Sequence, residues 1–120
     1  MFFVLACFSS FIAVAFGAFG AHALKTKIAP EFLSTFEIGV RYQLFHSIAI
    51  FVVAWASSVR PEIDFEMAGW LFVAGIVLFS VSLYLLSLTG LRQFAIITPL
   101  GGMSFLAGWI WLGWKAMRGL

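Results

Sequence analysis

The stretch AGWLFVAGIVLFSVSLYLLSL, residues 68–88, runs for 21 residues without a charged side chain. At a rise of 1.5 Å per residue, a helix of about 20 residues crosses the roughly 30 Å hydrocarbon core of a bilayer. Three more apolar stretches of similar length lie at residues 2–23, 38–59 and 94–114. The sequence therefore predicts an all-α protein, a four-helix transmembrane bundle.

The composition indicates that lipid is the solvent of this fold. The 120 residues are 63% hydrophobic and 10% charged, which lies far from the values of a water-soluble domain. The net charge of +2 is small and scattered, so we expect the lipid bilayer as a partner and no nucleic acid.

Prolines and short polar segments set the limits of the helices. Pro30 suits the first position of the second helix, and Glu31 suits its positive dipole end. Pro99, close to Gly101 and Gly102, either kinks the last helix or marks its start. We expect one integral-membrane domain, residues 1–120, with helices at about 2–24, 30–59, 68–89 and 94–117.

The first two helices differ from a standard span. The first has no basic segment before it, and its apolar run exceeds the roughly 7–15 residues of a signal peptide, so we expect a transmembrane helix. The second, unbroken from residue 30 to 58, would be about 43 Å long and would project beyond the bilayer at its start. Within it, Glu37 and Arg41 have the spacing of a helix-surface ion pair.

An even number of spans places both termini and the 60–67 turn on one side of the membrane, here named face A. The connections 25–37 and 89–93 then lie on the opposite side, face B. Loop lysines and arginines divide equally between the faces, so the positive-inside rule gives no orientation. All five tryptophans belong to the half nearer face A and suggest an interfacial belt, and the fifteen phenylalanines are expected to face lipid.

Polar side chains within the spans gather in the half nearer face B. On the second helix, Gly39, Gln43 and His46 share one stripe, with Tyr42 at its edge. Polar side chains at membrane depth turn inward to find partners. We therefore predict one polar cluster near face B that draws on all four helices: His22, Tyr42, Gln43, His46, Tyr84 and Thr98.

Two interpretations of this cluster stay open. Its side chains could bind a quinone head group or haem, or relay a proton. Alternatively, they hydrogen-bond one another and fix helix register, at roughly 0.6–2 kcal/mol for each bond. Two histidines and the distant Cys7 fall short of the three or four ligands of a metal site, so we expect no metal and no cofactor.

Small residues recur at the spacing that lets transmembrane helices approach closely. They serve either packing within the bundle or an interface with a partner. The set comprises Ala13, Gly17, Gly20 and Ala21 in the first helix, and Gly101, Gly102, Ser104 and Gly108 in the last.

Three motifs carry a family resemblance: GAFGAHAL at residues 17–24, GxxYQxxH at 39–46, and TPxGGxSFLAGW at 98–109. In this order and spacing, the chain resembles the YgdD/YwdK-like small membrane proteins, the family of the domain of unknown function four-two-three, which has a mitochondrial relative in animals. The resemblance covers essentially the whole chain. It implies a multi-pass protein of the bacterial inner membrane with both termini in the cytoplasm, and it implies no particular activity.

We expect a membrane protein without catalytic activity, an accessory or assembly subunit that packs against a larger membrane complex or self-associates. Minimal loops and the small-residue strips favour this role. The first alternative is a quinone- or haem-binding redox protein that uses His22 and His46. The second is a small transporter or channel, which the lack of a long polar stripe or inverted repeat disfavours.

Overall fold

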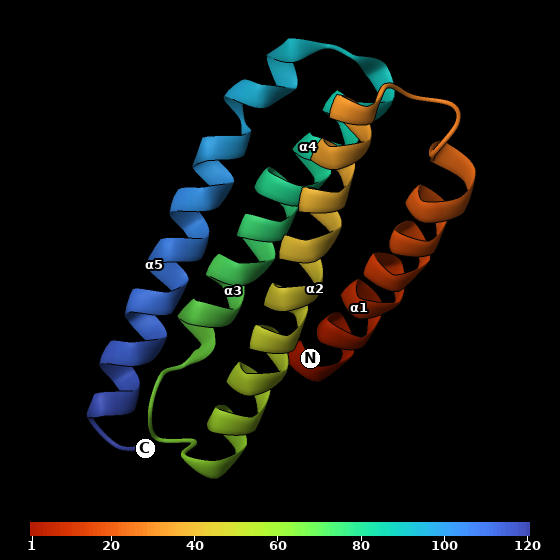
Figure 1. The fold of residues 1–120 in the computed structure, drawn as a ribbon. Helices are drawn as coiled ribbons and strands as arrows, with labels where there is room; N and C mark the ends of the chain where they lie inside the picture. Colours follow the sequence, from red (N-terminus) through yellow and green to blue (C-terminus); the bar gives the residue numbers. More distant parts are fainter.

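The computed structural model describes residues 1–120, and the chain is helical throughout apart from its connections (Figure 1). Four helices are long and apolar enough to span a membrane, which confirms the predicted fold class. They comprise α1 (Phe2–Phe19) with the π-helical turn η1 (Gly20–Leu24); α2 (Pro30–Val59); α3 (Glu66–Gly75), the π-helical η2 (Ile76–Val81) and α4 (Ser82–Thr89); and the 3₁₀ turn η3 (Arg92–Ile96) with α5 (Thr98–Met117).

The prolines set two helix starts. Pro30 opens α2 after an extended Ala29, and Pro99 lies in the first turn of α5. Pro99 therefore marks the start of α5 and does not kink it, because a proline lacks the amide proton that a first turn leaves unpaired. Residues 92–96 before it form a 3₁₀ turn, so the span expected at about 94–117 consists of this turn and the regular helix α5.

Both termini and the 60–65 turn lie at one end of the molecule, and the 25–29 and 90–91 connections lie at the other (Figure 1). At face A, Arg60 donates hydrogen bonds to the carbonyl of Gly119 and, at 2.5 Å, to Glu62. A bond from its own backbone N–H and the bond from Arg60 lower the pKa of the Glu62 carboxyl, so this surface turn keeps its ion pair at neutral pH.

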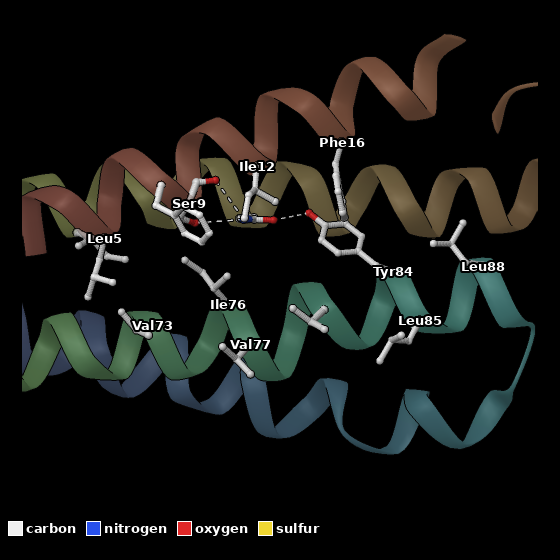
Figure 2. Close-up of a pocket in the computed structure, with 14 residues that line it drawn as sticks. Leu5, Ser9, Ile12, Phe16, Val73, Ile76, Val77, Tyr84, Leu85 and Leu88 are labelled. Atoms are coloured by element: carbon white, nitrogen blue, oxygen red, sulfur yellow. Dashed lines mark hydrogen bonds between the residues drawn. The ribbon is translucent and has the colours of Figure 1, made fainter. Parts of the chain in front are cut away.

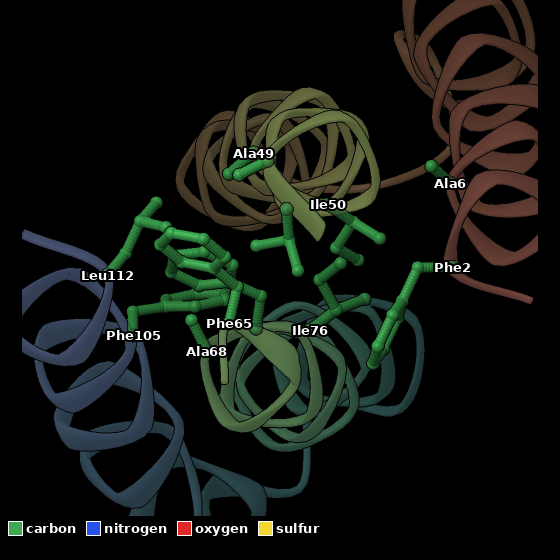
Figure 3. Packing of buried hydrophobic residues seen from close by; sticks show 12 residues of the cluster. Phe2, Ala6, Ala49, Ile50, Phe65, Ala68, Ile76, Phe105 and Leu112 are labelled. Atoms are coloured by element: carbon green, nitrogen blue, oxygen red, sulfur yellow. The ribbon is translucent and has the colours of Figure 1, made fainter. Parts of the chain in front are cut away.

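Aromatic rings seated against glycines hold the helices together. The main core lies between α2, α3 and α5 (Figure 3) and includes Phe65, Phe72 and Phe105, so the expectation that the phenylalanines face lipid is wrong for these rings. A Cβ added to the facing glycines would lie 2.3–3.0 Å from a ring atom, so a larger residue would force the ring to move. The pairs are Phe105 with Gly75, Phe72 with Gly108, Phe36 with Gly20, and Phe2 with Gly69.

Helix α1 stands to one side of this core and packs along α2 (Figures 1 and 3). It reaches the helix formed by α3, η2 and α4 through two aromatic contacts. Phe2 meets Trp70 edge-on at 5.1 Å near face A, and Phe16 meets Tyr84 at 4.9 Å nearer face B. Between these contacts the two helices remain apart.

The small residues serve mainly the interior of the bundle. A Cβ on Gly101 would lie 2.3 Å from the backbone nitrogen of Phe79, and the Ser104 hydroxyl donates to the carbonyl of Leu71 at 2.7 Å. Gly17, Gly20, Gly108 and the buried Ala13 likewise pack internally. Ala21 is exposed, and Gly102 has only one side-chain atom, 3.9 Å away, near the position of a Cβ.

We expect Gly101→Ala to destabilise the bundle by about 1–3 kcal/mol, the usual cost of overpacking, because the new methyl group meets backbone atoms of η2 that cannot rotate away. Gly113→Ala is the matched control, since it lies on the same helix with open space around it. Both variants gain the same helix propensity, so the difference in their unfolding midpoints in detergent measures the contact. Equal midpoints would contradict the close packing of α5 on η2.

Candidate functional site

One polar network joins α1, α2 and α4 in the membrane interior. The Gln43 amide nitrogen donates to the carbonyl and the hydroxyl of Ser9, at 3.1 and 3.2 Å. The Tyr84 hydroxyl donates to the Gln43 amide oxygen at 2.6 Å (Figure 2). Ser47 lies 2.6 Å from the Ser9 hydroxyl and donates to the Gln43 carbonyl at 2.7 Å. We name Ser9, Gln43, Ser47 and Tyr84 the glutamine network.

The glutamine network satisfies the Gln43 side chain completely, although Gln43 is 96% buried. A buried amide without partners in lipid costs several kcal/mol, whereas each interhelical bond gains far less. The network therefore fixes which faces of α1, α2 and α4 meet. The sequence pattern predicted Gln43 and Tyr84 and missed Ser9 and Ser47, although Ser47 follows Gln43 by one turn on the same stripe.

An apolar groove of about 560 Å³ opens beside the glutamine network, between α1 and the helix of α3, η2 and α4 (Figure 2). From α2, Gln43 and Ile50 also line it. Aliphatic and aromatic side chains form its walls, chiefly Leu5, Phe8 and Ile12 on one side and Val77, Val81 and Leu85 on the other.

A second polar contact lies on the side of α2 that faces α5. The buried His46 ring stacks on Phe105, with ring centroids 3.6 Å apart and planes within 8°. Its Nδ1 lies 2.8 Å from the carbonyl oxygen of Tyr42, and its Nε2 accepts a hydrogen bond from the Trp109 indole at 3.0 Å. Trp109 was expected to belong to the interfacial belt, but its indole N–H donates a hydrogen bond to His46 inside the bundle.

These two contacts define the tautomer of His46. A carbonyl oxygen only accepts, so Nδ1 carries the proton, and the Trp109 N–H requires an unprotonated Nε2. Both ring nitrogens of the neutral imidazole are then used. The Nε2 lone pair, which would bind haem iron or a metal, is occupied by the indole.

The structure does not bring the six predicted residues into one cluster, so that prediction is wrong. Gln43 and Tyr84 belong to the glutamine network, and His46 belongs to the contact with α5. The Thr98 hydroxyl lies 2.6 Å from that of Ser82, away from both. Tyr42 is 43% exposed, and His22 is exposed.

The depth of His22 explains why it stays apart. Gly20, two residues before it, packs against Phe36. Phe36 precedes His46 by ten residues of α2, or about 15 Å along the axis. The two histidines therefore lie at different depths. Their side chains are not close enough to form one quinone, haem or proton-relay site.

We expect Tyr84→Phe to destabilise the protein by about 0.6–2 kcal/mol, because the amide oxygen of Gln43 loses its buried donor. A double-mutant cycle with Gln43→Leu, read from unfolding in detergent, should give a coupling energy of the same order. Ser87→Ala is the control, since the Ser87 hydroxyl bonds only within its own helix. Strictly additive effects of the two substitutions would contradict the network.

The His46 tautomer gives a second test. Nitrogen-15 NMR of labelled protein should show a neutral ring protonated at Nδ1. Trp109→Phe removes the donor to Nε2 and should shift that resonance, whereas Trp111→Phe should leave it unchanged because the Trp111 indole bonds to Asp64. A ring protonated at Nε2 would contradict this geometry.

Four apolar spanning helices around buried hydrogen bonds define a polytopic α-helical membrane protein. Comparison with known proteins gives the family. The model of the family described as "Protein of unknown function (DUF423)" matches residues 16–102, and the chain belongs to this family.

The curated relatives resemble the chain over nearly its whole length. The UPF0382 membrane protein YwdK of Bacillus subtilis (strain 168) is 42% identical over 119 residues, which cover 98% of this chain and 97% of the relative. The UPF0382 inner membrane protein YgdD of Escherichia coli (strain K12) is 45% identical over 106 residues, which cover 88% of this chain and 81% of the relative. No solved structure matches the chain.

Proposed function

We propose that this protein is a non-catalytic accessory subunit of the cell inner membrane that packs against a larger membrane protein, with both termini in the cytoplasm. Its relatives carry the names of membrane proteins, and YgdD that of an inner membrane protein. The single observation that carries the proposal is an unpaired arginine on a concave membrane-facing surface between α2 and α5, here named the α2–α5 face.

The α2–α5 face encloses a hollow of about 680 Å³. Arg41 lies on it and is exposed, and the only ion pair in the structure joins Arg60 to Glu62. The helix-surface pair expected between Glu37 and Arg41 is therefore not formed. Arg41 lies three residues inside the apolar stretch 38–59, where a charge is costly unless a partner accepts its hydrogen bonds.

The remainder of this surface suits a second helix. A Cβ on Gly102 would have only one atom within 4 Å, at 3.9 Å, and Gly102 lines the hollow together with the exposed Tyr42 and Met103. Glycines let transmembrane backbones approach, and Tyr, Met and Arg are enriched at protein interfaces. The partner we infer is a transmembrane helix with a carboxylate or carbonyl acceptor opposite Arg41.

The proposal predicts that Gly102→Leu releases the protein from its complex, because the new side chain fills the hollow that the partner helix occupies. Ala18→Leu on α1 is the matched control, an exposed small residue on another helix. The measurement is the native mass of the tagged protein in mild-detergent extracts of its own membrane. Wild type and Ala18→Leu should migrate in one complex with a stoichiometric larger subunit, and Gly102→Leu should migrate alone.

Arg41→Gln provides the second arm of this experiment. It should weaken the complex without lowering the unfolding midpoint, since Arg41 makes no side-chain hydrogen bond or ion pair within the chain. If wild type migrates alone, the accessory role is wrong. If it migrates as a dimer that Gly102→Leu dissociates, the partner is a second copy.

A further inference from the structure

The apolar groove beside the glutamine network has a shape that the accessory role does not explain. The contact of Phe2 with Trp70 lies beyond its end near face A. The contact of Phe16 with Tyr84 joins its two walls nearer face B, and Leu85 and Leu88 continue the lining from there toward face B. Along α1, these contacts are fourteen residues apart, or about 21 Å. The groove holds about 560 Å³ between α1 and the helix of α3, η2 and α4 (Figure 2).

We propose that this groove binds one hydrocarbon chain of an anionic phospholipid, with the phosphate head group held at face B. The groove lies across α2 from the α2–α5 face, so this inference does not depend on the proposed accessory role.

A hydrocarbon chain fits the groove better than a protein helix or water. A helix is about 10 Å wide with its side chains, so it could lie along the groove only by breaking the contact of Phe16 with Tyr84 that joins the two walls. Water requires two to four polar partners, and twelve of the fourteen lining residues are hydrophobic. The polar atoms of Gln43 are already paired within the glutamine network. A single flexible chain fills such a slot without disturbing either.

The wall of the groove formed by the third spanning helix has an unusual backbone conformation. The middle of the third spanning helix is the π-helical η2, which supplies Ile76, Val77 and Val81 to the lining. π-Helical turns within α-helices are rare and occur frequently at functional sites. Here the wider turn lies between Trp70 and Tyr84, the two residues through which this helix contacts α1.

The charged residues at the two faces determine at which face the lipid head group lies. At the face B end, Lys25 follows Leu24, which packs in one cluster with Phe16 and Tyr84. Lys27 and Arg92 lie in the same pair of connections, so three cations meet the head-group region there, with Glu31 as the nearest acid in the sequence. With Arg41, face B has four cations against Glu31 and Glu37, a net charge of +2. At face A, three cations balance the three acids Glu62, Asp64 and Glu66. A phosphate is therefore favoured at face B.

Native mass spectrometry of the purified protein in mild detergent tests the groove. The probes are phosphatidylglycerol and phosphatidylcholine with identical chains. Wild type should retain one phosphatidylglycerol, and Val77→Trp, which fills the groove, should lose it. Val14→Trp is the matched control: Val14 is 63% exposed and Val77 55%, and Val14 lies outside the groove. Equal retention by the two tryptophan variants would overturn the proposal.

The head-group arm uses Lys25→Gln, Lys27→Gln and Arg92→Gln, which lie outside the core and keep the test valid if Val77→Trp does not fold. Each should weaken phosphatidylglycerol binding by up to about fivefold and leave phosphatidylcholine unchanged. Equal binding of the two lipids by wild type would overturn the charge-directed site. A dimer abolished by Val77→Trp would assign the groove to a second copy instead, and either result leaves the accessory role at the α2–α5 face to its own test.

Discussion

The structure depends on aromatic rings that fill notches left by glycines. Lipid removes most of the hydrophobic drive between transmembrane helices, so close packing and interhelical hydrogen bonds must hold them together. The rings of Phe72 and Phe105 lie against Gly108 and Gly75, which brings α3 and α5 together on one side of α2. Phe105 in turn supports the His46 ring, and the same packing aims Trp109 at its Nε2. The polar contact is thus a consequence of the packing.

Helix α1 is held by the packing of an aromatic ring against a glycine near each of its ends, but not in its middle. Phe2 fills the notch at Gly69, and Phe36 fills the one at Gly20. Between them the glutamine network holds α1 to α2, and α2 to α4, by hydrogen bonds. Helix α1 thus packs along α2 but reaches the helix of α3, η2 and α4 only through aromatic side chains. The groove between α1 and η2 follows from this difference.

The four spans and the helix starts at Pro30 and Pro99 could be predicted from the sequence. So could the inward orientation of the polar residues Gln43 and Tyr84. Which side chains contact one another could not be predicted from the sequence. Gln43 and His46 lie about 60° apart on α2 and share a stripe, but α2 is central, so one meets α1 and α4 and the other meets α5. Periodicity gives a direction on one helix and cannot tell which helix lies there.

Because α2 is central, its two sides support different surfaces of the protein. Within the motif at residues 39–46, Gly39 accepts the Tyr84 ring, Gln43 completes the glutamine network, and Tyr42 and Arg41 face outward beside α5. Each polar side-chain atom of Gln43 and His46 has a hydrogen-bond partner within the chain, so these two residues hold the helices together. They support two different surfaces, one with the unpaired Arg41 beside α5 and the other with the apolar groove beside α1. A substitution that opens the groove should therefore leave the α2–α5 face intact, because α2 between them is fixed from both sides.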